Sequence, residues 1–327
     1  MNIREAYDRG RSLLSQAGVP EADLDAWYLL EYVTGIGRAS FYAEPDREMT
    51  GDWAGRYEEA IARRSRRIPL QHITGEQEFM GLSFQVNGDV LIPRQDTEIL
   101  VEEALKILKE MQKEQVVSGQ EEPKEPGRED GIRILDLCTG SGCILLSVLY
   151  YGALRQGASE RKGVRGTDRA PGAEGRKLTG VGADISEKAL AVARKNAEAL
   201  GIEAEFVCGD LFENLSGKFS LILSNPPYIK SEEIEKLQDE VRLHDPRAAL
   251  DGMEDGLHFY RRIIESAGDY LVPGGWLVFE IGHDQAEDVT ALMRQAGYGQ
   301  IRVKKDLAGL DRVVCGVYSE MERPEAG

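Results

Sequence analysis

The sequence predicts an α/β fold in which a Rossmann-like, doubly wound sheet follows a small helical domain and a β-hairpin connector. Three patterns point to it. A short apolar strand at 132–137 runs into a glycine-rich turn and then an apolar helix, which is how a doubly wound nucleotide-binding sheet begins. Two later strands lead into carboxylates, Asp184 and Asp210. Residues 1–68, by contrast, show helical spacing of their apolar side chains.

The composition is that of an ordinary globular protein long enough for two domains. Of 327 residues, 42% are hydrophobic and 30% are charged, close to the average of soluble domains. A net charge of −17 repels a nucleic-acid backbone, so we expect a protein or small-molecule partner and no direct nucleic-acid substrate. No apolar run approaches the roughly 18 residues of a membrane span, and no secretory signal is visible. We therefore expect a cytoplasmic protein without membrane contact.

The cysteines and histidines do not suggest a metal site. Both kinds are few and scattered along the chain, without the spacing of metal ligands, of a disulfide framework or of a catalytic triad. Hydrolytic and metal chemistry are therefore disfavoured. The cysteines lie in apolar segments, where we expect them to be reduced and buried: Cys138, Cys143, Cys208 and Cys315.

Residues 1–68 form the first predicted domain, which is helical. Its densest apolar stretch, 24–33, lies between two glycine-containing breaks. The basic cluster 63–67 ends the last helix, where its charge would complement the helix dipole. Binding of an acidic partner such as RNA is the alternative for this cluster.

Residues 69–93 form the predicted connector. Near-alternation of apolar residues at 79–86 predicts one strand, and 90–92 predicts a second, with turn signals at Gly81 and 87–88. This pattern indicates a β-hairpin.

The larger predicted domain runs from 94 to 320 and begins with a helix at about 96–109. Two segments inside it, 112–131 and 152–178, are rich in charged or small residues and poor in large apolar ones. We interpret both as inserted flexible loops.

A glycine-rich turn follows the strand at 132–137. Its glycines let the backbone approach a ligand closely, and the free N–H groups at the start of the next helix point at that ligand. The pattern differs from Gly-x-Gly-x-x-Gly, so a cofactor without a pyrophosphate fits better than a dinucleotide. The alternative is that the glycines only pack strand against helix. The turn consists of Cys138, Thr139, Gly140, Ser141 and Gly142.

Two carboxylates follow the next strands. Asp184 comes about 40 residues after the glycines instead of the roughly 20 of a compact βαβ unit, and the insertion 152–178 accounts for the excess. Its position suits bridging two ribose hydroxyls. A third strand at 206–208 leads to Asp210, where this carboxylate and the backbone of Leu211 could meet an adenine edge. Either acid alone could be a solvated loop residue, but a pair at successive strand ends is a specific signal.

A turn of Asn225, Pro226, Pro227 and Tyr228 follows the apolar strand 219–223. Ligands of open α/β sheets bind at this carboxyl edge. Because prolines have no N–H group, the turn accepts hydrogen bonds. The Asn225 side-chain oxygen and a backbone carbonyl near Pro226 could hold both hydrogens of a planar NH2 group, so that its nitrogen presents its lone pair. The alternative is a tight turn that merely ends a strand.

The rest of the chain completes an alternating pattern. Helices are expected at 187–200, 257–271 and 285–296, and strands at 276–281, 301–304 and 313–317.

Taken together, these motifs resemble the class I S-adenosylmethionine-dependent methyltransferases, and more narrowly the PrmC/HemK family of release factor glutamine N5-methyltransferases. The resemblance covers nearly the whole chain, including the segments 91–98 and 245–250. The Asn-Pro-Pro-Tyr turn alone is shared with adenine-N6 methyltransferases, whereas the Ile-Pro-Arg helix entry is more selective. Departures are Cys138, where the family often has Gly, Asp245 in place of Glu, and two longer loops.

The resemblance implies a seven-stranded methyltransferase domain, a helical domain that recognises substrate, and an enzyme that uses S-adenosyl-L-methionine. The methyl group would pass to the amide nitrogen of the glutamine in the Gly-Gly-Gln motif of peptide chain release factors, leaving S-adenosyl-L-homocysteine. Residues 138–142 would cradle the methionine part of the cofactor, Asp184 its ribose, and Asp210 with Leu211 its adenine.

The same resemblance assigns the substrate pocket to the Asn-Pro-Pro-Tyr turn. Asn225, beside the cofactor, and the Pro226 carbonyl would grip the glutamine amide, while Pro227 and Tyr228 would line the pocket. We expect a monomer. Three alternatives stay open: a ribosomal-protein glutamine methyltransferase, an adenine-N6 nucleic-acid methyltransferase, and a binding module without enzymatic activity.

Overall fold

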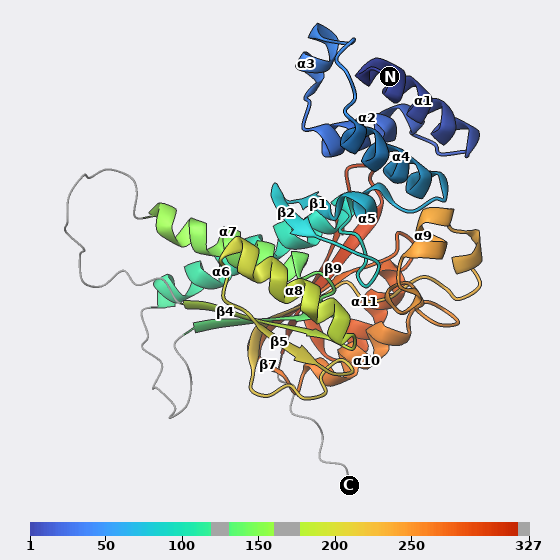
Figure 1. Ribbon diagram of the computed structural model, residues 1–327. Coiled ribbons are helices and arrows are strands. Elements are labelled where there is room, and N and C mark those ends of the chain that lie inside the picture. The colour runs from blue at the N-terminus through green and yellow to red at the C-terminus, as the bar shows by residue number, and fades with distance from the viewer. Residues whose placement is uncertain (119–130, 160–176, 320–327) are drawn as a thin grey trace, which may run out of the picture.

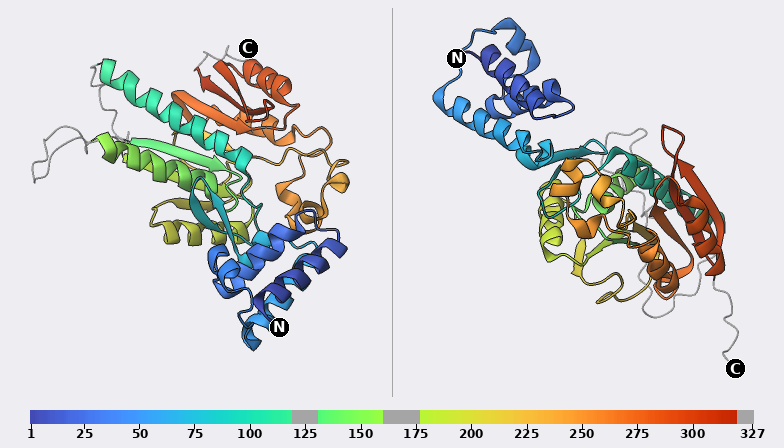
Figure 2. Two further views of the ribbon diagram at one scale, coloured as in Figure 1. Left: turned by 90° about the horizontal axis from the view of Figure 1, so that it is seen from above. Right: turned by 90° about the vertical axis from the view of Figure 1, so that its right-hand side faces the viewer.

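The computed structural model describes residues 1–118, 131–159 and 177–319. Its ribbon shows a helical part at the N-terminus beside a larger α/β part (Figure 1). Two further views show the helical part standing at one end of the α/β part (Figure 2).

The helical part is built around an apolar core of residues such as Ile3, Leu30 and Ile61. Its first helix begins with a capping box, in which Asn2 accepts from the Glu5 N–H and the Glu5 side chain accepts from the Asn2 N–H. The core also includes Ile73. The helices are α1 (Ile3–Gln16), α2 (Ala22–Thr34), α3 (Arg38–Ala43), α4 (Gly51–Ser65) and α5 (Leu70–Thr74).

The connector is a β-hairpin, but its second strand differs from the prediction. Its antiparallel strands are β1 (Glu76–Phe79), which begins before the segment 79–86 that was predicted as one strand, and β2 (Leu82–Gln85), which lies within that segment. Met80 and Gly81 both have positive φ, 53° and 71°, which is the backbone of a tight hairpin turn. Residues 90–92 form no strand. The alternation at 79–86 therefore folds back on itself instead of running straight.

The α/β part holds a seven-stranded sheet in the order β5-β4-β3-β6-β7-β9-β8. The first five strands in this order are parallel, and β9 and β8 continue the sheet antiparallel. This sheet confirms the predicted fold class. The strands are β3 (Gly131–Leu137), β4 (Lys177–Asp184), β5 (Glu205–Cys208), β6 (Phe219–Ser224), β7 (Leu271–Glu280), β8 (Tyr298–Lys305) and β9 (Asp311–Tyr318).

Helices cover both faces of the sheet, each over its own apolar core. One core contains Leu100, Leu145 and Ala197 from α6 (Glu98–Ser118), α7 (Cys143–Ser159) and α8 (Glu187–Leu200). The other contains Ile263 of α10 (His258–Ala267) and Val289 of α11 (Ala286–Gln295). Shorter helical segments are η1 (Gln95–Thr97), η2 (Ile234–Lys236), α9 (Asp239–His244) and η3 (Arg247–Ala249).

Two helices run further than the predicted loops allow. α6 continues to Ser118 and α7 to Ser159, so the expected loop starts at 112 and 152 were wrong. Residues 112–115 are Gln, Lys, Glu and Gln, which are good helix formers as well as polar, and extending an existing helix is far easier than starting one. The remaining parts, 119–130 and 160–176, lie outside the described residues.

The cysteines are free thiols, and one expectation about their burial was wrong. Cys143 and Cys315 are buried and Cys138 is half-buried, but Cys208 is exposed. Cys208 lies on β5, the edge strand of the sheet, where one side lacks a covering neighbour. Among the described helices, none has both the length and the apolar character that crossing a bilayer requires.

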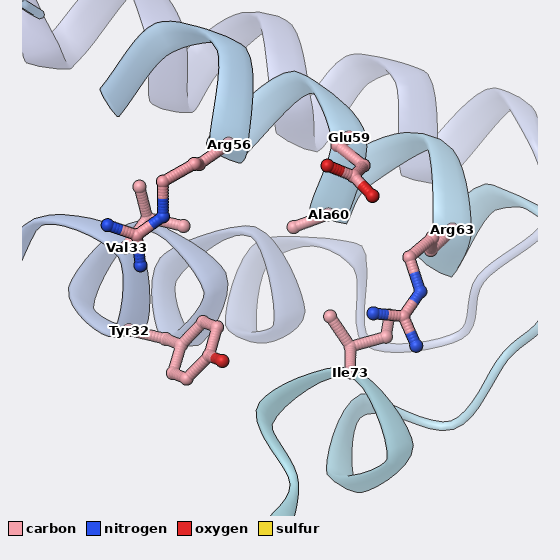
Figure 3. Close-up of a pocket in the computed structure, with 7 residues that line it drawn as sticks. All are labelled: Tyr32, Val33, Arg56, Glu59, Ala60, Arg63 and Ile73. Atoms are coloured by element: carbon pink, nitrogen blue, oxygen red, sulfur yellow. The ribbon is translucent and has the colours of Figure 1, made fainter. Parts of the chain in front are cut away.

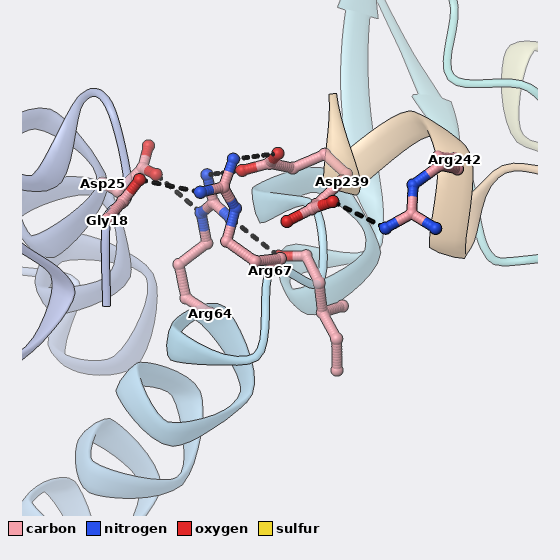
Figure 4. A network of polar contacts seen from close by, with 8 residues as sticks. Gly18, Asp25, Arg64, Arg67, Asp239 and Arg242 are labelled. Carbon is pink, nitrogen blue, oxygen red and sulfur yellow. Dashed lines mark hydrogen bonds and ion pairs between the residues drawn. The ribbon is translucent and has the colours of Figure 1, made fainter. Parts of the chain in front are cut away.

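A buried ion network joins the helical part to the α/β part. Arg64 of α4 is 6% exposed and donates to Asp25 of α2 at 2.6 Å and to Glu240 of α9 at 2.8 Å. Arg67 donates to the same Glu240 at 2.5 Å (Figure 4). These two arginines belong to the basic cluster 63–67, so their charge is neutralised within the chain.

Candidate active site

The register of the sheet brings the predicted site residues to one edge. Leu137 of β3 pairs with Ala183 of β4 on one side and with Ser224 of β6 on the other. The residues that directly follow these three therefore end up side by side, and they are Cys138, Asp184 and Asn225. The chain runs from β3 to β4 and β5 on one side and returns to β6 on the other. Ligands of doubly wound sheets bind at such a reversal of strand order.

The glycine-rich turn is anchored by two hydrogen bonds from Thr139. The Thr139 N–H donates to the Ala183 carbonyl at 3.0 Å, and the Thr139 hydroxyl donates to the buried Asp136 carboxylate at 2.6 Å. Burial raises the pKa of Asp136 to about 7, and the hydrogen bond from Thr139 lowers it. Asp136 was not among the predicted site residues, although a carboxylate inside an apolar strand is a sequence signal.

The two glycines of this turn have different reasons to be glycine. A Cβ on Gly142 would lie 3.2 Å from the Ala193 Cβ, so this residue allows α7 and α8 to pack closely. A Cβ on Gly140 would meet nothing within 4 Å, yet its φ is +55°. Gly140 therefore combines a left-handed backbone with open space in front of it, and Gly142, with φ at +79°, combines the same kind of backbone with close packing.

Asn196 of α8 ties the same turn to the connector. Its amide donates to the Ser141 carbonyl at 2.9 Å and to the Gln85 carbonyl at 3.1 Å, while its oxygen accepts from the Gln85 N–H at 2.7 Å. The side chain is fully buried. One carboxamide thus bonds the end of β2 and the glycine-rich turn together.

The Asp184 carboxylate is fixed by backbone donors. One oxygen accepts from the Gly140 N–H and the other from the Ser186 N–H, both at 2.9 Å. Burial raises the pKa of Asp184, and the backbone hydrogen bonds lower it. Each oxygen keeps a further lone pair, so a rigidly held carboxylate can still accept hydrogen bonds from a diol.

Asp210 and Leu211 lie next to Asp184. The Gly209 N–H donates to the Asp184 carbonyl at 3.1 Å, which brings the segment after β5 against the end of β4. Asp210 accepts from Arg262 of α10 at 2.8 Å, and Leu211 is buried with φ at 56°. Arg262 was missed by the sequence interpretation, because α10 follows Asp210 by some 50 positions and nothing local links them.

The Asn-Pro-Pro-Tyr turn is held by close packing against a later loop. The Tyr228 carbonyl accepts from the Gln285 amide at 3.1 Å. A Cβ on Gly252 would lie 2.7 Å from the Tyr228 Cα, and a Cβ on Gly256 would overlap the Tyr228 carbonyl. These two glycines and Gln285 were also missed, although Asp251-Gly252 and Asp255-Gly256 are a repeated dipeptide in the sequence.

A pocket opens beside this turn, and it includes some predicted residues but not all. Asn225 and Tyr228 line it, whereas Pro226 and Pro227 are buried and are not among its described lining residues. Burial raises the pKa of Tyr228 to about 12, so its hydroxyl stays protonated near neutral pH. The pocket is lined by Leu91, Arg94, Asn225, Tyr228, Ile229, Ala249, Leu250 and Glu280.

Another hollow lies in the helical part, between α2, α4 and α5 (Figure 3). Tyr32, Arg56 and Arg63 are among its lining residues. No predicted site residue lines it, and the strand ends described above belong to the other part of the chain.

Comparisons with known proteins agree with this geometry. The family described as the PrmC N-terminal domain matches residues 5–75, and the methyltransferase small domain matches residues 172–250. A release factor glutamine methyltransferase of Geobacter sulfurreducens is 38% identical over 315 residues, which cover 96% of each chain. One from Caulobacter vibrioides is 37% identical over 327 residues, which cover 99% of each chain. The chain belongs to the release factor glutamine methyltransferase family. This membership confirms the resemblance predicted from the motifs.

One solved structure has the same fold class as this family member. The hMettl16 catalytic domain, solved in complex with the MAT2A 3′UTR hairpin 6, has a TM-score of 0.50 at 15% identity, covering 81% of this chain and 84% of that one. At this identity the likeness concerns the fold alone. A release-factor-specific protein-(glutamine-N5) methyltransferase of Alicyclobacillus acidocaldarius is 27% identical, covers 72% of this chain and 99% of its own, and has a TM-score of 0.37.

Proposed function

We propose that this protein transfers a methyl group from S-adenosyl-L-methionine to the side-chain amide nitrogen (N5) of the glutamine in the Gly-Gly-Gln motif of peptide chain release factors. The observation that supports the proposal is the sheet register: Asp184 and Asn225 lie at the ends of the two strands that flank β3, which leads to Cys138. The turn that we propose for the amide and the turn that we propose for the cofactor therefore share one edge of the sheet. Family membership supports the same activity.

The residues at this edge fit the cofactor. S-adenosylmethionine supplies a methyl group bound to a positively charged sulfur. Open space in front of Gly140 leaves room for its methionine part beside residues 138–142. Asp184 would accept hydrogen bonds from the ribose hydroxyls, since backbone N–H groups already hold both of its oxygens in place. Asp210 and the Leu211 backbone would meet the adenine edge.

The Asn-Pro-Pro-Tyr turn would orient the glutamine. The Asn225 side-chain oxygen and the Pro226 carbonyl would each accept one hydrogen of the substrate NH2 group. An amide nitrogen is a poor nucleophile because its lone pair is delocalised, so orientation matters; well-aligned reactants gain up to roughly 7–11 kcal/mol. The two carbonyl dipoles would also stabilise positive charge that develops on the nitrogen. Tyr228 would line the pocket as a neutral phenol.

One assay tests the proposed substrate against the alternatives. Protein is incubated with S-adenosylmethionine carrying a labelled methyl group and with a release factor, ribosomal proteins or DNA in parallel. We expect label only in the release factor, and none in a release factor whose motif glutamine is replaced by alanine. Label in a ribosomal protein or in DNA would favour the corresponding alternative, and label in none would leave a binding module.

The proposal includes the setting of the reaction. Release factors act in translation, so we place the protein in the cytoplasm, acting as a monomer on a protein substrate. A net charge of −17 supports a protein substrate over a nucleic acid, because phosphate backbones are repelled by it.

A further inference from the structure

Glu280 lies beside Asn225 at the end of β7. Ser224 of β6 pairs with Phe279 of β7, so the residues that follow this pair, Asn225 and Glu280, are neighbours at the same edge of the sheet. Both line the pocket described above, together with Tyr228. Asn225 therefore lies between the end of β3, where we propose that the cofactor binds, and the Glu280 carboxylate at the end of β7.

This carboxylate is buried and only partly paired. Glu280 is 1% exposed, and the Thr97 hydroxyl is hydrogen-bonded to its carboxylate. Its other oxygen, Oε2, is buried and has no hydrogen-bond partner among the described residues. Buried polar atoms in native proteins nearly always have a partner, because leaving one unpaired is energetically costly. Because Glu280 lines the pocket, this oxygen is a candidate acceptor for a ligand that donates a hydrogen.

We propose that Glu280 accepts the proton that the glutamine amide loses when it is methylated. This inference rests on the proposed function. The nitrogen lone pair forms the new N–C bond to the methyl carbon, while the C–S bond breaks and its electron pair stays on sulfur. As this bond forms, one of the two nitrogen hydrogens leaves the carbonyl that held it and passes to Glu280 as a proton, so that the methylated amide ends neutral. The carboxylic acid later releases the proton to solvent.

The electrostatic setting suits this role. Burial raises the pKa of Glu280 to about 7, and Thr97 and the cations Arg312 and Arg94 lower it. A protonated amide is far more acidic than such a carboxylic acid, so the transfer is downhill, and a proton acceptor works best with a pKa near the working pH. The charged or titratable groups that interact with Glu280 are Arg94, Asp96, Cys143, Tyr228, Tyr260 and Arg312.

The sign of the pH dependence follows from the reactive form. Glu280 must be ionised to take up a proton, so the rate of methyl transfer is expected to rise with pH through about 7 and then level off. The neighbouring phenols do not produce this limb, since burial raises the pKa of Tyr228 to about 12 and that of Tyr260 further still.

The test is a single-turnover measurement of methyl transfer to the release factor at several pH values, for the wild type and Glu280→Gln. Loss of the carboxylate is expected to slow transfer by about 100-fold or more and to abolish the pH limb near 7. Calorimetric titration should show cofactor affinity within a few fold of the wild type. Glu103→Gln is the matched control, because Glu103 is equally buried but faces Arg302 and Lys304 instead of the pocket; its pH limb should remain.

A second variant guards against misfolding. If Glu280→Gln does not fold, Glu280→Ala assayed with added formate supplies a carboxylate to the emptied site, and recovery of activity with formate would support the inference. An unchanged rate and pH limb in Glu280→Gln, or no recovery with formate in folded Glu280→Ala, would overturn it. A wild-type protein that leaves the release factor unlabelled would instead overturn the proposed function itself.

Discussion

At the scale of single residues, the proposal gives Asn225 and Asp184 separable tasks, although they lie at the ends of the two strands that flank β3. Asn225 lines the pocket and would bind the amide, whereas Asp184 accepts from the Gly140 N–H and would bind the cofactor. Asn225→Ala should lower the rate of methyl transfer by about 100-fold or more, because one of two acceptors that orient the amide is removed. Cofactor affinity, measured by calorimetry, should stay within a few fold. Equal losses in both would contradict the amide assignment.

Asp184→Ala should have the opposite effect. Removing a carboxylate that accepts hydrogen bonds from the ribose is expected to weaken cofactor binding by at least about tenfold, the equivalent of one charged hydrogen bond of roughly 1.5–3 kcal/mol. At saturating cofactor the rate of methyl transfer should largely recover. Unchanged cofactor binding in a titration would remove Asp184 from the ribose role.

The site residues that were predicted from the sequence alone belong to patterns of residues adjacent in the chain. A glycine-rich turn, an acid after a strand and an Asn-Pro-Pro-Tyr turn can be recognised without knowing what lies beside them. Glu280 and Arg262 could not be assigned in this way, because their roles depend on which strands pair and on which helix crosses which strand end. The sequence did contain a signal for Glu280, because it is the one charged residue in an apolar strand.

At the scale of elements, the contact between α4 and α9 is a clear target. Arg64 is 6% exposed and bridges Asp25 and Glu240, so Arg64→Ala leaves Asp25 without its cation and leaves Glu240 with Arg67 alone. Breaking a buried pair from one side costs about 3–5 kcal/mol, and urea unfolding should show a loss of this order. Arg9→Ala is the control, since the Arg9–Glu58 pair is more than half exposed and should contribute about 1 kcal/mol or less.

A loss of less than about 1 kcal/mol in Arg64→Ala would contradict this view of the contact. Screening by salt offers a second check, because exposed pairs weaken with added salt and buried ones change much less. The sequence could not predict this contact: it indicated a basic helix end at 63–67 but not that an acid more than 170 positions later would meet it.

The hairpin and the long helices show where element-level prediction reached its limit. Within the predicted strand 79–86, residues 82–85 are extended, but the turn at Met80-Gly81 depends on two positive φ angles, and only Gly81 gave a turn signal in the sequence. The ends of α6 and α7 were set too early, because polar residues that favour helix resemble polar residues of a loop when only composition is considered.

At the scale of the whole molecule, buried acids shape how stability depends on pH. Burial raises the pKa of Asp136 from 3.8 to about 7, so between these values the folded chain holds a proton that the unfolded chain has released. The contribution of such a group is fully present below its unfolded pKa and is lost as pH rises through the folded one. Asp136→Asn, which cannot ionise, should therefore lose less stability than the wild type between pH 5 and pH 8, as measured by urea unfolding. An identical pH slope in both proteins would contradict the assignment.

The overall fold was the most predictable level of all. Alternating strands and helices of ordinary length admit few arrangements in a doubly wound sheet, and the seven-stranded sheet that results is among them. The contact between the helical part and the α/β part could not be predicted from the sequence, because it depends on single side chains from segments far apart in the chain.

Asn196 links the connector to the glycine-rich turn. Because its one carboxamide is hydrogen-bonded to both segments, displacing one without the other would break these hydrogen bonds. If a protein bound to the helical part shifted the connector, it would therefore also shift residues 138–142. Binding there and binding of the methyl donor would then influence each other equally, by thermodynamic reciprocity.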